Sequence, residues 1–305
     1  PIIARARQII AHDAKPPTRF AMLTRRRFLL MLSGLAAALG ASAFWSARSR
    51  SYAGPVSDHF DGLHFFDPNG APPKSLGDFL RWRFTRDPAV WPARDPSPFA
   101  DRPPPRVDGM AVRLTYVGHA SWLVQTDGLN ILIDPVWSER ASPVTFAGPK
   151  RVNDPGIAFE ALPKIDAVLV THGHYDHLDV ATLARLAQRF DPRVVTPLGN
   201  DAAMRAADPA IRCEAHDWGS RIALGKRVAV TLVPTRHWTA RGLLDRNKAL
   251  WASFVLETPA GKIYIVGDSG YGDGGHFRRV RAAHGALRLA ILPIGAYEPR
   301  WFMRD

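Results

Sequence analysis

A short segment of this chain, Val170–Val180, contains three histidines and two aspartates directly behind an apolar run. His172 and His174 stand two positions apart, so at the end of an extended strand their side chains point to the same side and can bind one metal ion. Asp176 and His177 lie just past the turn and can reach a second ion. Zinc binds nitrogen and carboxylate oxygen at about 2.0–2.2 Å, and two ions about 3.5–4 Å apart can share one hydroxide as nucleophile. Because three of the eleven histidines fall within six positions, the segment predicts a metal site and not a chance polar loop.

Several further segments carry recognisable patterns. They are Gly118–Ser121, Ile133–Val136, Gly148–Arg151, Pro234–Trp238, Arg241–Trp251, Gly267–Tyr271 and Pro293–Trp301. Together with the H-x-H-x-D-H pattern, they resemble the metallo-β-lactamase superfamily. Within it they are similar to the branch of N-acylphosphatidylethanolamine-hydrolysing phospholipases D and their bacterial relatives. The similarity extends from about His64 to the last residue.

The resemblance implies a ligand set for two zinc ions. It places His172, His174 and His237 on one ion, Asp176 and His177 on the other, and Asp268 as a bridge between them. It also implies one more histidine on the second ion, a few residues beyond the segment 297–303. The sequence ends at Asp305 before that position and starts at Pro1 without Met, so we expect a fragment that lacks this ligand. Manganese or iron can replace zinc, because sites of His and Asp accept several metals.

The activity implied by the resemblance is hydrolysis of a phosphodiester, with Asp176 and Asp268 as the catalytic carboxylates. A hydroxide between the metals would attack phosphorus in an N-acylated phosphatidylethanolamine, and the products would be phosphatidic acid and an N-acylethanolamine. One alternative is a lactone or small-ester hydrolase that uses the same ions. The other is an inactive, membrane-associated truncated homologue. The sequence does not indicate an oligomeric state.

Three polar residues near the motif are candidates for supporting roles. Asp134 ends an apolar strand and either orients a ligand histidine, as metal-bound imidazoles commonly need, or caps a turn. His119 is predicted to neighbour the active site from a strand turn. Asp179 either accepts a hydrogen bond from a ligand histidine or caps the following helix. His216, His276 and His284 have no informative spacing.

Other functions are disfavoured by charge and motif. Residues 1–53 carry nine Lys and Arg side chains against one acid, Asp13, so most of the net charge of +12 lies there. No basic helix, zinc-finger spacing or aromatic-basic repeat indicates nucleic-acid binding, although a modest positive surface favours anionic lipid. Gly267–Gly275 lacks the phosphate-binding patterns, so its glycines are expected to let the backbone pass close to the metals. The absence of G-x-S-x-G disfavours a serine hydrolase.

The N-terminal segment has the pattern of an export signal. Thr24–Leu30 places consecutive arginines ahead of the apolar stretch Met31–Gly40, and Ala41–Ala43 offers small residues for cleavage. The arrangement resembles a twin-arginine signal, which implies export to the periplasm. The apolar run 28–45 is also close to membrane-spanning length, so an uncleaved anchor is the alternative.

The elements that must position the site follow from apolar patterning. Strands are predicted at 113–117, 121–126, 129–133, 167–170, 193–196, 228–233, 252–256, 262–266 and 289–292. A helix is predicted at 180–190, and a short one at 76–84 that presents Phe79, Leu80 and Trp82. We expect the α/β class and the metallo-β-lactamase αββα sandwich, two packed mixed sheets with outer helices. The ligands would lie at strand ends along one edge, where rigid strands hold them in place.

Composition divides the chain into four parts. They are an extension at 1–21, the export signal or anchor at 22–53, a Pro-rich arm at 54–105, and a metallo-hydrolase domain at 106–305 that we expect to be incomplete at its C-terminus. The prolines of the arm forbid a long helix or a central strand, yet its aromatic residues are too many for a free linker. The arm therefore either covers a sheet edge or takes part in the approach of lipid. The expected partners are a phospholipid or another small-molecule substrate and a membrane surface.

Overall fold

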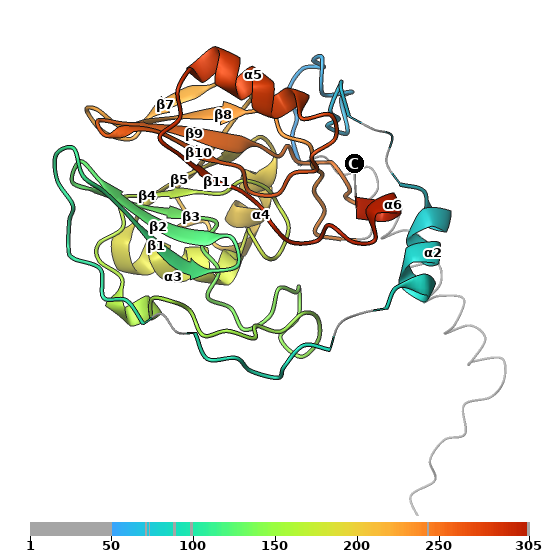
Figure 1. Ribbon diagram of the computed structural model, residues 1–305, viewed down its shortest axis with the longest axis horizontal. Helices are drawn as coiled ribbons and strands as arrows, with labels where there is room; N and C mark the ends of the chain where they lie inside the picture. The colour runs from blue at the N-terminus through green and yellow to red at the C-terminus, as the bar shows by residue number, and fades with distance from the viewer. Residues whose placement is uncertain are drawn as a thin grey trace, which may run out of the picture. The chain divides into compact units, whose positions relative to one another are not determined.

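The computed structural model describes residues 51–303 except 71, 73, 88, 89, 98, 99 and 243. Two sheets form its centre (Figure 1). The first is six-stranded, in the order β1-β2-β3-β4-β5-β6. Its strands are β1 (Val112–Gly118), β2 (Ser121–Thr126), β3 (Leu129–Ile133), β4 (Ala167–Leu169), β5 (Arg193–Pro197) and β6 (Cys213–His216). Strands β1 to β3 pair antiparallel and β3 to β6 pair parallel, so the sheet is mixed.

The second sheet is five-stranded, in the order β11-β10-β9-β8-β7. Its strands are β7 (Arg221–Ala223), β8 (Ala229–Val233), β9 (Ser253–Thr258), β10 (Gly261–Ile265) and β11 (Leu289–Ile291). Strands β7 to β10 pair antiparallel, and β11 joins β10 in parallel. Because β8 and β10 flank the antiparallel β9, they run in the same direction and their carboxyl ends lie at one edge.

Alternating side chains build three apolar layers. Ile131 and Ile133 of β3 face the second sheet and pack with Phe254 and Ile265, whereas Leu132 points to the opposite face. There α3 (Val180–Phe190) and α4 (Asn200–Ala207) cover the first sheet. On the far side α5 (Gly275–His284) covers the second sheet with Val280. This order of helix, sheet, sheet and helix confirms the predicted αββα sandwich (Figure 1).

The prediction of elements was accurate for the apolar runs, including the short strands β4 and β11, and missed elements without such a run. The predicted strands 121–126 and 129–133 and the helix 180–190 agree with β2, β3 and α3 at both ends. The short strands β6 and β7 were missed, because neither is long enough or apolar enough to show an alternation. Helix α4 was missed too: it begins after Gly199 without a side-chain cap, so its sequence carries no start signal.

The Pro-rich arm lies along the first sheet. The carbonyls of Pro104 and Pro105 accept hydrogen bonds from Gln125 and Asn130 at 2.8 and 2.9 Å. Asp101 accepts from Arg113 of β1 at 2.6 Å. These bonds fix the arm at the edge strand β1 and its neighbours, as a cover for a sheet edge would require.

Helix α2 (Leu76–Thr85) occupies the earlier part of the arm and begins at Ser75, which forms a capping box with Asp78. Trp82 stacks on Phe302 of α6 (Arg300–Met303) with ring centroids 5.1 Å apart. Phe79 and Leu80 are exposed, as predicted, whereas Trp82, which was predicted to be presented with them, is half-buried. Within the described part of the chain, every helix is too short or too polar for a membrane crossing. The extension 1–21 and the apolar stretch 28–45 lie outside the described residues.

Candidate metal centre

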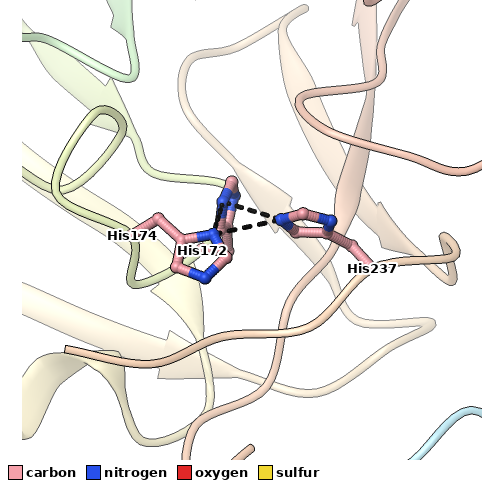
Figure 2. A group of neighbouring side chains, drawn as sticks. All are labelled: His172, His174 and His237. Atoms are coloured by element: carbon pink, nitrogen blue, oxygen red, sulfur yellow. Dashed lines mark hydrogen bonds between the residues drawn. The ribbon is translucent and has the colours of Figure 1, made fainter. Parts of the chain in front are cut away.

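The three histidines from two sheets converge on one point (Figure 2). His172 and His174 follow β4 of the first sheet, and His237 follows β8 of the second. His172 Nε2 lies 2.9 Å from His174 Nδ1, and His237 Nε2 lies 3.1 Å from each of these two nitrogens. Two nitrogens bound to one tetrahedral zinc are about 3.3 Å apart, given zinc–nitrogen distances near 2.0–2.1 Å. The nitrogen triangle therefore has the size of one face of a zinc coordination shell.

A second group of donors lies beside the first. His177 Nε2 is 3.4 Å from Asp268 Oδ1, and Asp268 Oδ2 is 3.8 Å from His237 Nε2. Asp176 Oδ2 is 3.1 Å from His119 Nε2. The donor atoms form three sets, each within 4.8 Å: His172, His174 and His237; His119, Asp176 and His177; and His172, His177 and Asp268. The structure thus brings together all six residues for which the resemblance implied metal binding, with Asp268 between the two groups.

Asp134 orients His177. Its carboxylate is fully buried, and Oδ2 accepts a hydrogen bond from His177 Nδ1 at 2.8 Å. Thr171 donates to the same carboxylate through its backbone N–H and its hydroxyl, both at 2.7 Å. Nδ1 of His177 therefore carries a proton, and Nε2 is the ring nitrogen that faces the site. The arrangement matches the predicted carboxylate partner of a ligand histidine.

Buried polar atoms without a hydrogen-bond partner show whether the site fits a metal ion. Among the described residues, Nε2 of His177 is buried and has no hydrogen-bond partner, and it lies 3.4 Å from Asp268 Oδ1. A buried polar atom without a partner is costly in a folded protein. Histidine nitrogens and carboxylate oxygens are ligands that zinc, manganese and iron accept. The residues present fit a divalent cation in each group.

Burial keeps the first group neutral. It lowers the pKa of His174 to about 4 and that of His237 to about 3. Burial and the neighbouring imidazoles hold the pKa of His172 well below its ordinary value. Unprotonated imidazoles are the form that binds metal, so these three side chains are ready as ligands at neutral pH.

The second group carries charge. Burial opposes ionisation of Asp176, but the hydrogen bond from His119 and the charge of His177 lower its pKa to about 2. Burial likewise opposes ionisation of Asp268, yet the neighbouring histidines hold its pKa below the ordinary value. Burial disfavours the charged form of His177, but the carboxylate of Asp134 raises its pKa well above the ordinary value. Both aspartates are therefore carboxylates at neutral pH.

Gly267 allows the loop of Asp268 to approach the first sheet. It adopts a φ of +67°, and a Cβ at this position would lie 2.8 Å from the Thr171 side chain, which itself binds Asp134. Only glycine fits such a close approach with a left-handed backbone. The expectation that glycines let the backbone pass close to the site is confirmed here.

Arg241 was not assigned a role from sequence, yet it holds the motif turn. Its Nη1 donates to the carbonyls of Gly173 and Leu178, both at 2.9 Å. Its guanidinium carbon lies 4.0 Å from the ring centroid of Tyr175, whose hydroxyl donates to the Arg241 carbonyl at 2.9 Å. Arg241 therefore connects the loop that carries His237 to the turn that carries the other histidines. Bonds to backbone carbonyls leave no spacing signal in a sequence.

The two alternatives predicted for Asp179 are resolved by its hydrogen bonds. Asp179 caps α3, accepting from Thr182 N at 3.2 Å and from Ser138 N at 2.9 Å. His276, dismissed from its spacing, is buried and lies 2.9 Å from Ser269 Oγ, next to Asp268. Its position at the start of α5 supports the Asp268 loop, and no pattern in the sequence marks it.

The strand order and the His and Asp donors at one edge of two packed sheets define the metallo-hydrolase class of the β-lactamase fold. The family model described as a β-lactamase superfamily domain matches residues 129–305, so the chain belongs to this family.

Relatives place the chain within that family. An uncharacterized protein of Mycobacterium tuberculosis is 38% identical over 207 residues, which cover 68% of this chain and 55% of that protein. The N-acyl-phosphatidylethanolamine-hydrolyzing phospholipase D 1 of Caenorhabditis elegans is 37% identical over 200 residues, 63% of this chain and 56% of that protein. The chain spans about half the length of these curated relatives. A solved metallo hydrolase of Ignicoccus hospitalis is 21% identical and has a TM-score of 0.45, covering 61% of this chain and 71% of that chain.

Proposed function

We propose that this chain hydrolyses the phosphodiester of an N-acylated phosphatidylethanolamine with two metal ions, zinc in the first instance. The observation that carries the proposal is the position of Asp268, which lies between three neutral imidazoles and the pair of Asp176 and His177. Such a shared carboxylate is typical of two-metal hydrolytic sites. The names of the Caenorhabditis elegans and Saccharomyces cerevisiae relatives, 37% and 32% identical, support the lipid substrate.

Different residues would hold the two ions and orient the ligands. Bound ions of this kind lower the pKa of water and offset negative charge on a phosphoryl oxygen. His172, His174 and His237 would hold one ion, and Asp176 and His177 the other, with Asp268 shared. Asp134 holds a proton on Nδ1 of His177, so Nε2 is the nitrogen that would bind the ion. The side chains of Asp176 and Asp268 are 42% and 37% exposed, so the phosphodiester would approach from their side.

Aromatic residues near the site favour a substrate with apolar chains. Trp238, next to His237, is 39% exposed and packs 4.4 Å from the His174 ring. Tyr271, three residues after Asp268, is 67% exposed. Aromatic side chains of this kind have an apolar body and a polar tip, which suits the boundary of a lipid.

Helix α2 supports the approach of a membrane surface. Its exposed apolar residues Phe79, Leu80 and Phe84 lie beside the exposed Arg81 and Arg83. Apolar and basic side chains together are typical of segments that lie in a membrane interface with anionic lipid. Export to the periplasm, or anchoring through residues 28–45, would place the enzyme next to such a surface.

The test is hydrolysis by the zinc-loaded chain. N-acylated phosphatidylethanolamine in mixed micelles should release phosphatidic acid, measured by mass spectrometry, and a chelator should abolish the release. Asp268→Asn should lower the rate by about 1000-fold, because the amide removes the shared carboxylate. Asp191→Asn, an exposed position at the end of α3 that is far from the motif turn, is the control and should stay within about threefold.

The outcomes separate the substrate from the metal chemistry. If the chain binds two ions and hydrolyses a lactone or a simple ester but no phosphodiester, the lipid assignment is wrong. If it binds metal and hydrolyses none of these substrates, the chain on its own is not a competent hydrolase.

A further inference from the structure

We propose that Arg246 binds the negative phosphate of the substrate beside the metal centre and so favours a charged diester over a neutral ester. The inference deepens the proposed function and rests on it, because it names a residue that recognises the phosphodiester. Arg246 lies in the loop between β8 and β9, which also carries His237. It acts as a fixed positive charge and not as a ligand of a metal ion.

Two ring contacts connect Arg246 to the first group of donors. Its guanidinium carbon lies 4.6 Å from the centroid of the Trp238 ring. The Trp238 ring meets the His174 ring edge to face, with centroids 4.4 Å apart, and its centroid lies 6.3 Å from that of His237. The guanidinium is therefore separated by one aromatic ring from two of the imidazoles that would hold an ion.

The positive charge of Arg246 is not neutralised by a carboxylate. The side chain is exposed, and among the described residues no acidic group raises its pKa, which partial burial lowers. Asp245, the acid next to it in the chain, accepts hydrogen bonds from the backbone N–H groups of Arg241 and Gly242 instead. The guanidinium is therefore available to an anion that arrives from solution.

Arg236, which precedes His237, is the contrasting case. It donates to Asp273 Oδ1 at 2.7 Å and to the Asn69 carbonyl at 3.1 Å. Its side chain is 14% exposed. Arg236 is thus paired and largely buried, as an arginine that supports the fold would be. Arg246 has neither property, although the same loop places both residues near the metal centre.

A guanidinium stacked on an aromatic ring suits a phosphate. Its planar fork donates two hydrogen bonds to two oxygens of one phosphate, and its charge does not change near neutral pH. The contact with Trp238 restricts the side chain before the substrate arrives, so less conformational freedom is lost on binding. A neutral lactone or ester gains nothing from this charge. Arg246 therefore favours an anionic phosphodiester among the substrates that the same metal ions could hydrolyse.

The experiment measures binding with a probe that the enzyme cannot hydrolyse. The probe is a short-chain phosphonate analogue of the N-acylated diester, in which a methylene group replaces the leaving oxygen. It is negatively charged, whereas its methyl ester is not. Calorimetry gives Kd for both compounds with the zinc-loaded 305-residue chain, with Arg246→Gln and with Arg246→Lys.

Arg185→Gln is the matched control. The Arg185 guanidinium lies 3.7 Å from the centroid of the Phe159 ring and pairs with Glu160 at 3.2 Å, so this variant also removes a guanidinium from an aromatic ring. Zinc content is measured on every sample. An unchanged zinc content shows that a variant keeps its fold and its metal centre.

We expect Arg246→Gln to bind the phosphonate about 10- to 30-fold more weakly than wild type and the uncharged methyl ester within about twofold of it. Arg246→Lys should recover part of the affinity, because it keeps the charge but lacks the planar fork. Arg185→Gln should bind both compounds as wild type does.

The proposal is wrong if wild type binds no phosphonate, if Arg246→Gln binds it as tightly as wild type, or if the variant loses the methyl ester to the same degree. It is also wrong if only inorganic phosphate depends on Arg246, because the residue would then serve free phosphate. These measurements need no turnover. Phosphonate binding that depends on Arg246, in a chain that hydrolyses no N-acylated diester, would overturn the proposed function and not the anion site.

Discussion

The two groups of donors differ in exposure and in charge. The first consists of His172, His174 and His237, whose burial keeps the imidazoles neutral. The second contains the carboxylate of Asp176, with a side chain that is 42% exposed, and the half-exposed His119. A buried, neutral nitrogen set favours a firmly held ion, whereas an open, anionic set leaves room for a substrate. If each group holds an ion, as we propose, the buried group would hold its ion firmly and the open group would leave room for the substrate.

Asp134→Asn is the change with the largest expected effect on this contrast. The asparagine amide cannot accept the His177 Nδ1 proton as a carboxylate does, and it leaves Thr171 with a poorer acceptor. We expect the second ion to bind about 10- to 100-fold more weakly and the first to change little. Metal titration followed by calorimetry measures both. Equal weakening of the two ions would show that the groups are not independent.

Arg241→Gln should affect the first group more than the second. The variant loses the guanidinium bonds to the Gly173 and Leu178 carbonyls that connect the His237 loop to the motif turn. We expect about tenfold weaker binding of the first ion, because the same ligand residues remain but their positions shift away from the best geometry. Tyr175→Phe keeps the ring under the guanidinium and removes one bond, so it is the milder control. An unchanged affinity in Arg241→Gln would mean that the turn holds its shape alone.

Acid should destabilise the metal-free protein through the first group. The pKa values of His174 and His237 fall to about 4 and about 3 in the folded chain, against about 6.5 when unfolded. The unfolded state therefore binds more protons below pH 6.5, and stability is lost as the pH falls from about 6.5 toward 4. His177, whose pKa is raised, has the opposite sign and offsets part of the loss. Thermal unfolding at pH 7 and pH 4.5 should differ by about 5 °C or more, and a His174→Gln variant should show a smaller difference.

Sequence reasoning found those parts of the site that lie close together in the chain. His172, His174, Asp176 and His177 share one turn, so spacing alone indicated their chemistry. His237 and Asp268 belong to the other sheet, and only the family resemblance assigned them, because contacts between sheets leave no local period. Asp134 was predicted as one of two alternatives. The structure decides between orienting a histidine and capping a turn, because the buried hydrogen bond from His177 to Asp134 forms only in the folded chain.

The fold was predictable for a related reason. Strands with both faces buried, such as β2 and β3, are long apolar runs and were placed at both ends. The roles of Arg241 and His276 were not predicted, because their hydrogen-bond partners are a backbone carbonyl and a serine hydroxyl, which leave no pattern in the sequence. Strand β7 was missed because only one of its three side chains is buried, whereas the equally short β4 is buried throughout and was predicted.

The donors come from the carboxyl ends of strands in both layers: β4 leads to the motif turn, while β8 and β10 lead to His237 and Asp268. An ion bound to all of them would fasten one sheet to the other at the open end of the sandwich. Unfolding would then require its release, and the midpoint of unfolding would depend on free metal concentration. At 100 times the dissociation constant this linkage amounts to about 2.7 kcal/mol. The metal available during folding would then determine how much of the protein is folded, independently of any catalysis.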